Sequence, residues 1–132
     1  MRLTTLLPLT LTLTAGFVFL GANLASADKP PKNLKVLKSD TDGKLLEKSM
    51  KELSKGLGVK CVACHVKGKF DSDEVKAKDA TRQFFTAALG EADAAKKEAA
   101  LKALLPALKL EAAKDAPGIW AGLKMIEPMK KK

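Results

Sequence analysis

Both cysteines and the one histidine of this chain lie within five residues, Cys61 to His65, in the pattern C-x-x-C-H. This pattern is the attachment signature of c-type haem, in which two thiols add to the porphyrin vinyl groups and the imidazole binds the iron. On a helical turn, residues i, i+3 and i+4 share one face, so Cys61, Cys64 and His65 can all point at one flat ligand. The motif therefore predicts one covalently attached haem c, with His65 as a ligand of its iron.

Three other kinds of site use similar residues. A thioredoxin-like redox centre also contains C-x-x-C, but it follows a strand, and no strand pattern precedes Cys61. A structural zinc needs a fourth ligand, and the sequence has no further Cys or His to supply one. A disulfide between Cys61 and Cys64 would leave the adjacent His65 unexplained. These three sites stay as alternatives to haem.

Residues 1–27 have the pattern of a cleaved secretory signal. Arg2 is followed by an apolar stretch, and Ala25-Ser26-Ala27 forms an A-x-A cleavage site. An uncleaved anchor is the alternative, because Leu3 to Leu24 is nearly long enough to span a bilayer. Cleavage predicts a mature domain of residues 28–132 without a stable membrane span. We expect this domain in the periplasm, the compartment in which bacteria attach haem covalently.

The elements that would position the motif are predicted to be helices. Residues 28–39 read as an extended lead-in, and Asp40, Thr41 and Asp42 offer N-cap oxygens for a helix that ends at Gly56 and Gly58. Its apolar residues recur on one face, at Leu46, Met50, Leu53 and Leu57. Because the chain turns from this helix directly into the motif, the apolar stripe can lie against one face of a porphyrin.

Further helices are expected after the motif. One should begin in the cluster Asp71-Ser72-Asp73 and end at Leu89 before Gly90, with Thr81, Phe84, Phe85 and Ala88 on its buried face. A helix-forming composition follows from Glu91, and Pro106 should kink or divide it. Pro117 and Gly118 predict a turn, followed by a short helix with Ile119, Leu123 and Ile126 buried. The terminal lysines are expected to be disordered.

These elements predict an all-α protein with one small domain. The sequence contains no alternating strand pattern, no internal repeat and no second C-x-x-C-H motif. The expected order is a helix, then the haem-binding turn, then further packing helices. We divide the domain into a haem-binding unit, residues 34–89, and a C-terminal helical extension, residues 91–127.

The haem-binding unit resembles the repeating unit of the multihaem cytochrome c subunit of photosynthetic reaction centres. The matching residues are Leu34 to Leu37, Met50, Leu57 to His65, Phe70 to Asp73, Lys78, Ala80 and Arg82. In that family the helix before each motif supplies a methionine as the sixth iron ligand, and the unit transfers electrons. The resemblance therefore implies Met50 as the sixth ligand. Since this chain has one motif where that subunit has several, it implies a free monohaem carrier.

Three candidate roles have competing explanations. A methionine on an apolar stripe is usually core, and Met125 or Met129 could bind the iron in place of Met50. Arg82 could pair with a haem propionate through a charge-assisted hydrogen bond, or it could occupy a solvated helix position. Trp120 could stack near the haem edge or belong to the core.

The predicted function is that of an exported monohaem cytochrome c, a c-type cytochrome that carries single electrons between redox partner proteins. It is not predicted to be an enzyme, because G-x-S-x-G, H-E-x-x-H and glycine-rich phosphate loops are absent from the sequence. A haem sensor or haem enzyme with an open sixth iron position is the alternative. A structural or assembly subunit of a respiratory complex is a third.

The charge of the chain favours acidic partners. Its formal net charge is +9, and the segment from Lys44 to Lys69 holds seven lysines against Glu47 and Glu52. Redox partners with acidic docking surfaces would be attracted to it, although a lysine-rich surface can also serve solubility alone. We expect no nucleic-acid partner and a monomeric protein.

Overall fold

The computed structural model describes residues 30–132, so the predicted signal, residues 1–27, lies outside the described residues. Within these residues, four α-helices follow one another: α1 (Gly43–Leu57), α2 (Lys76–Ala88), α3 (Ala94–Leu104) and α4 (Ala116–Ile126). The same part of the chain has three short 3-10 turns: η2 (Cys61–Ala63) after α1, η3 (Leu105–Leu108) after α3 and η4 (Glu127–Met129) after α4. Between residues 30 and 132 there is no β-strand, only two isolated bridges. The predicted all-α class is confirmed.

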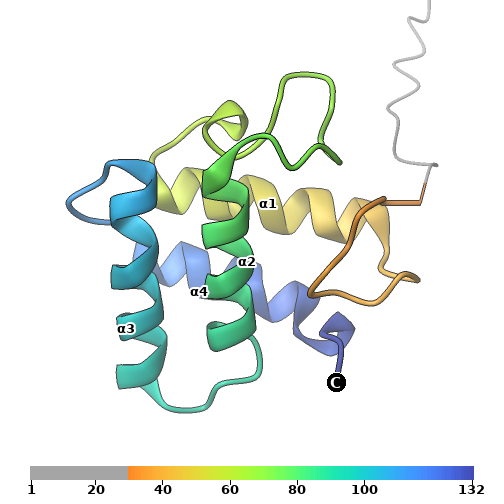
Figure 1. Cartoon of the computed structure of the whole chain (residues 1–132). Helices are drawn as coiled ribbons and strands as arrows, with labels where there is room; N and C mark the ends of the chain where they lie inside the picture. The colour runs from red at the N-terminus through yellow and green to blue at the C-terminus, as the bar shows by residue number, and fades with distance from the viewer. Residues whose placement is uncertain (1–29) are drawn as a thin grey trace, which may run out of the picture.

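The helices pack as two pairs. In Figure 1, α1 and α4 run across the view, and α2 and α3 stand side by side. α1 packs along α4, and α2 packs along α3 and η3. The pairs share one apolar core, whose most buried side chains are Phe84, Leu89, Leu104, Ile119 and Ile126. Trp120 is half-buried and packs against this core, and its ring centroid lies 6.0 Å from that of Phe84. Within residues 30–132, no helix combines the length and the apolar character needed to cross a bilayer.

α1 forms where the sequence predicts it. The Asp42 carboxylate accepts hydrogen bonds from the backbone N–H groups of Lys44 and Leu45, which have no partner inside the helix. The helix ends at Gly58, whose φ of 77° is the left-handed conformation that glycine adopts without strain. Leu53 and Leu57 on its apolar stripe are buried, so the stripe faces inward.

Small residues allow α1 and α4 to approach closely. Gly56 lies against Ile119, and a Cβ atom built on Gly56 would be 2.5 Å from the Ile119 Cγ1 atom and 2.8 Å from the Asp115 carbonyl oxygen. The buried Ser49 hydroxyl donates to the Gly122 carbonyl at 2.9 Å. The pair is therefore fixed by close backbone contact as well as by apolar burial.

The predicted start of α2 is wrong. The helix begins at Lys76, not within Asp71-Ser72-Asp73, and no side chain caps its N-terminus. The reason is that the Asp73 carboxylate is occupied elsewhere, by Lys35 and Arg82 at 2.8 Å each. The end before Gly90 is confirmed, because Gly90 has a φ of 75°.

The two prolines act differently in the C-terminal extension. The α-helical part of α3 ends at Leu104, and a 3-10 turn contains Pro106, so the predicted interruption is confirmed. The predicted turn at Pro117 and Gly118 is wrong, because α4 already begins at Ala116. Proline is tolerated in a first helical turn, and the Asp115 carboxylate caps that turn by accepting from the Gly118 N–H at 3.1 Å.

The expectation of disordered terminal lysines is also wrong. The Lys131 N–H donates to the Val36 carbonyl at 2.9 Å, and the Lys38 N–H donates to the Met129 carbonyl at 2.8 Å. The Lys130 ammonium donates to the carbonyls of Thr86 and Leu89 at the end of α2. The Lys130 ammonium thereby bonds to carbonyl groups that have no partner inside the helix. The C-terminal tail thus holds the lead-in against the helices.

We predict that Gly56→Ala lowers the free energy of unfolding by about 1–3 kcal/mol, the usual cost of overpacking. Alanine is the better helix former by about 1 kcal/mol, so helix propensity alone predicts the opposite sign. Chemical denaturation would measure the change, with Lys48→Ala, an exposed position on the same helix, as the control. A Gly56→Ala protein as stable as the wild type would contradict the close α1–α4 contact.

Candidate functional site

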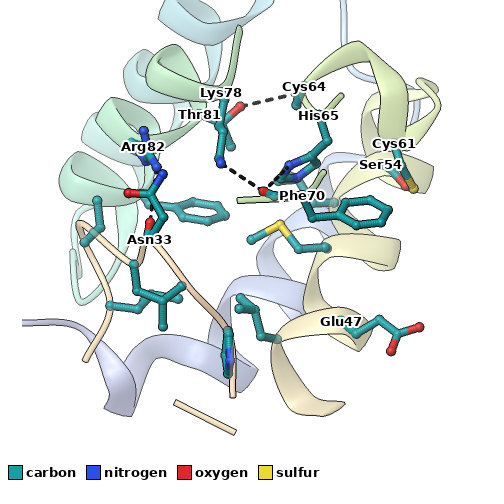
Figure 2. Close-up of a pocket in the computed structure, with 18 of the residues that line it drawn as sticks. Asn33, Glu47, Ser54, Cys61, Cys64, His65, Phe70, Lys78, Thr81 and Arg82 are labelled. Carbon is teal, nitrogen blue, oxygen red and sulfur yellow. Dashed lines mark hydrogen bonds between the residues drawn. The ribbon is translucent and has the colours of Figure 1, made fainter. Parts of the chain in front are cut away.

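A pocket of about 570 Å³ lies between α1, α2, the lead-in and the segment that contains the motif. Most of its lining is apolar, and it includes Leu34, Val36, Leu46, Leu53, Leu57, Val59, Phe70 and Phe85. Cys61, Cys64 and His65 all line this pocket, and Figure 2 shows Arg82 and Asn33 across from them. Its volume is within the range of pockets that bind small molecules and cofactors.

The motif forms a single tight turn after α1. The N–H groups of Cys64 and His65 both donate to the Cys61 carbonyl, at 3.2 and 3.0 Å. This pattern closes the helical turn that the spacing predicts, and it brings the three side chains to one pocket. Both thiols are free, with Cys61 exposed and Cys64 half-buried.

His65 is oriented by the backbone of the segment that follows it. Its Nδ1 atom lies 3.1 Å from the Phe70 carbonyl oxygen, and its ring contacts the Phe70 ring edge-on. A carbonyl can only accept, so this bond requires the proton on Nδ1 and leaves the Nε2 lone pair free. Burial lowers the pKa of His65, and the positive charges of Lys78 and Arg82 lower it further. The hydrogen bond to the Phe70 carbonyl acts in the opposite direction. The neutral imidazole that a metal requires is therefore favoured.

Cys64 is held by Thr81 on α2. Its sulfur lies 3.6 Å from the Thr81 hydroxyl, and that hydroxyl donates its own proton to the Ala77 carbonyl at 2.8 Å. Cys64 is therefore the donor. Burial raises the pKa of the Cys64 thiol, which keeps it protonated. A thioredoxin-like centre follows a strand, and between residue 30 and the motif the structure contains no strand, which argues against that alternative.

The zinc alternative gains no support from the surrounding side chains. Across residues 30–132, no group of three or more His, Cys, Asp and Glu side chains is placed to hold a metal ion. Iron in a haem is different, because the porphyrin supplies four of its ligands and the protein needs to add only one or two.

The methionines differ in their positions. Met50 lines the pocket from α1, on the same wall as Leu46 and Leu53. Met125 and Met129 are half-buried and are not among the residues that line it. The structure therefore brings Met50 and His65 to one pocket, while the role of Met50 as an iron ligand stays a prediction.

Arg82 lines the pocket and is already paired. Its guanidinium donates to the Asp79 carboxylate at 2.8 Å and to the Asn33 carbonyl at 3.2 Å, and it forms an ion pair with Asp73. Its side chain is only 14% exposed, so the alternative of a solvated position is wrong. Its pairing with a propionate stays a prediction, and a propionate would share the guanidinium with two carboxylates.

Sequence reasoning missed the central role of Asp73. This carboxylate accepts from Asn33 and Lys35 of the lead-in and forms ion pairs with Lys78 and Arg82 of α2. Hydrogen bonds from Lys35, Arg82 and Asn33 hold its pKa well below the ordinary value of 3.8. The lead-in lies about 40 positions earlier in the chain, so no local pattern indicated these contacts.

No protein-family model, no curated protein and no solved structure matches the chain. The resemblance to the reaction-centre cytochrome subunit therefore depends on the residues quoted for it, and the site has to be interpreted from its own geometry.

We predict that Asp73→Asn lowers the melting temperature at neutral pH, because the paired carboxylate stabilises the fold. Because the pKa of Asp73 is lowered in the folded protein, its carboxylate stabilises the fold at pH values above the unfolded-state pKa near 3.8. This stabilisation is lost progressively as the pH falls below that value. The difference in melting temperature between variant and wild type should therefore shrink as the pH falls from 4 toward 2. Asp71→Asn, in the same exposed loop, is the control. Equal melting temperatures for Asp73→Asn and wild type at pH 7 would contradict this role.

Proposed function

We propose that this protein is an exported monohaem cytochrome c that carries single electrons between redox partner proteins. The observation that carries the proposal is that Cys61, Cys64 and His65 line one apolar pocket together with Met50. Two thiols at attachment spacing, an imidazole and a thioether are the groups that hold haem c in electron-transfer proteins. In this proposal the protein is a carrier, not an enzyme.

The pocket itself supports a large apolar cofactor. Soluble proteins rarely expose large contiguous apolar surfaces unless those surfaces bind something. An open pocket of about 570 Å³ with mostly apolar walls therefore favours an apolar ligand of cofactor size. The apolar walls would suit the porphyrin ring, and the polar lining residues Asn33, Lys35 and Arg82 would suit its carboxylates.

The chain's own residues would each have a defined task. Cys61 and Cys64 would tether the ring, and Thr81 keeps the Cys64 thiol at the pocket wall. His65 would bind through Nε2, because Nδ1 is committed to the Phe70 carbonyl. Met50 would supply a second protein ligand to the iron, and the leucines of α1 would exclude water. When bound, haem c supplies an iron that accepts one electron from a reduced donor and passes it to an oxidised acceptor.

The proposed partners have acidic docking surfaces. The segment from Lys44 to Lys69 contains the motif, and its lysines at 44, 48, 51, 55, 60, 67 and 69 are exposed. Two of them, Lys51 and Lys60, line the pocket. Attraction between opposite charges mainly speeds encounter, and salt screens it. An electron-transfer rate that stays constant as salt is added would remove this part of the proposal.

We predict that the purified exported protein carries haem on both thiols. Mass spectrometry after denaturation should find one haem per chain, and a reduced-minus-oxidised spectrum should show a c-type cytochrome. Cys61→Ala and Cys64→Ala should each lower the yield of holoprotein strongly, whereas Ser54→Ala, a neighbouring pocket residue, should not. Denatured wild-type protein of unmodified mass would refute the proposed function.

We predict that Met50→Leu lowers the reduction potential and opens the iron to carbon monoxide. Leucine keeps the apolar volume of the wall, so the variant removes the thioether with little repacking. The matched control is Met125→Leu, which should leave both properties unchanged. If Met50→Leu keeps the wild-type potential and excludes carbon monoxide, Met50 is a core residue. If wild-type protein itself binds carbon monoxide, the alternative of a haem sensor or haem enzyme with an open sixth position is favoured.

A further inference from the structure

The Phe70 carbonyl oxygen accepts two hydrogen bonds. One comes from His65 Nδ1 at 3.1 Å, and the other comes from the Lys78 ammonium at 2.9 Å. Figure 2 shows both side chains directed at this one oxygen, His65 from the motif and Lys78 from α2. A carbonyl oxygen has two lone pairs, so both acceptor positions are occupied.

Lys78 is unusually buried for a lysine, and its ammonium has several partners. The residue is only 9% exposed, although lysine is seldom buried without partners. Its ammonium also donates to the Ser72 carbonyl at 2.7 Å and lies 3.4 Å from an Asp73 carboxylate oxygen. These contacts fix the loop from Phe70 to Asp73 against the first turns of α2.

We infer that Lys78 is a positioning residue for the iron-binding histidine, acting through the Phe70 carbonyl. It fixes the acceptor that orients the His65 ring, and it keeps a positive charge on the side of the ring away from the iron. This inference rests on the proposed function, because it requires that His65 binds iron through Nε2.

Both effects of Lys78 raise the reduction potential. By drawing electron density from the shared carbonyl, the ammonium weakens the His65 hydrogen bond, so the imidazole donates less charge to the iron. Its own charge disfavours ferric iron, which is more positive than ferrous iron by one unit. Because the ammonium is buried, solvent and salt screen it weakly. The same charge contributes to the lowered pKa of His65, after burial.

A purely structural role for Lys78 makes a different prediction. A lysine that only anchored the loop would affect stability and leave the potential of the folded holoprotein unchanged. The reduction potential therefore separates the two roles, and a variant that keeps the charge should behave differently from one that loses it.

The test is spectroelectrochemical titration of full-length holoprotein. Lys78→Gln keeps a donor and loses the charge, and it should shift the reduction equilibrium toward ferric iron by about tenfold, the lower end of what one neighbouring charge does to a titrating group. For a one-electron couple this is about 59 mV. Lys78→Arg should stay close to the wild type. The matched control is Lys76→Gln, an exposed lysine two residues earlier on α2, which should leave the potential unchanged.

A wild-type potential in Lys78→Gln, or an equal fall in Lys78→Gln and Lys78→Arg, would overturn the inference and leave the cytochrome proposal standing. If Lys78→Gln yields no folded holoprotein, Lys78→Met takes its place, because methionine is apolar and similar in length to lysine. Its reduction potential is compared with that of Lys78→Arg, and the expected outcome is the same. Wild-type protein without covalent haem would overturn both the proposed function and this inference.

Discussion

The apolar pocket beside α1 is the feature on which the other elements depend. A domain of this size has a small core, and beside that core lies an open pocket of about 570 Å³ with leucine, valine and phenylalanine walls. The surrounding helices hold these walls apart. α1 is fixed on its other side by close contact with α4 through Gly56, and α2 is supported by α3. The packing of α1 on α4 and of α2 on α3 therefore supports the walls of a pocket. In most small domains, such packing fills the centre of the molecule.

One chain of contacts joins the motif to the remaining walls. His65 bonds to the Phe70 carbonyl, Lys78 bonds to the same oxygen, and Asp73 lies beside Lys78. Asp73 in turn holds Asn33 and Lys35 of the lead-in. The orientation of the imidazole is thus connected to a segment more than 30 positions earlier. Most of these bonds involve a charged group, which makes them stronger and more directional than neutral ones.

Features with a local cause could be predicted from the sequence. The Asp42 cap, the stop at Gly58 and the inward stripe of α1 each depend on residues within a few positions, and so does the interruption at Pro106. The motif itself was evident from its spacing. The start of α2 was missed because Asp73, which resembles a cap, bonds to distant partners instead. The contacts of Lys78 could not be predicted either, because its acceptors are backbone carbonyls that have no signature in the sequence.

The pairing of the C-terminal tail with the lead-in has a consequence for the order of folding. Lys131 bonds to the Leu34 carbonyl across 97 positions, whereas the leucine stripe of α1 and the motif are close neighbours in sequence. Closing a long loop costs more entropy than closing a short one, and contacts of high sequence separation form slowly. The pocket walls formed by α1 and the motif can therefore assemble before the C-terminal tail pairs with the lead-in.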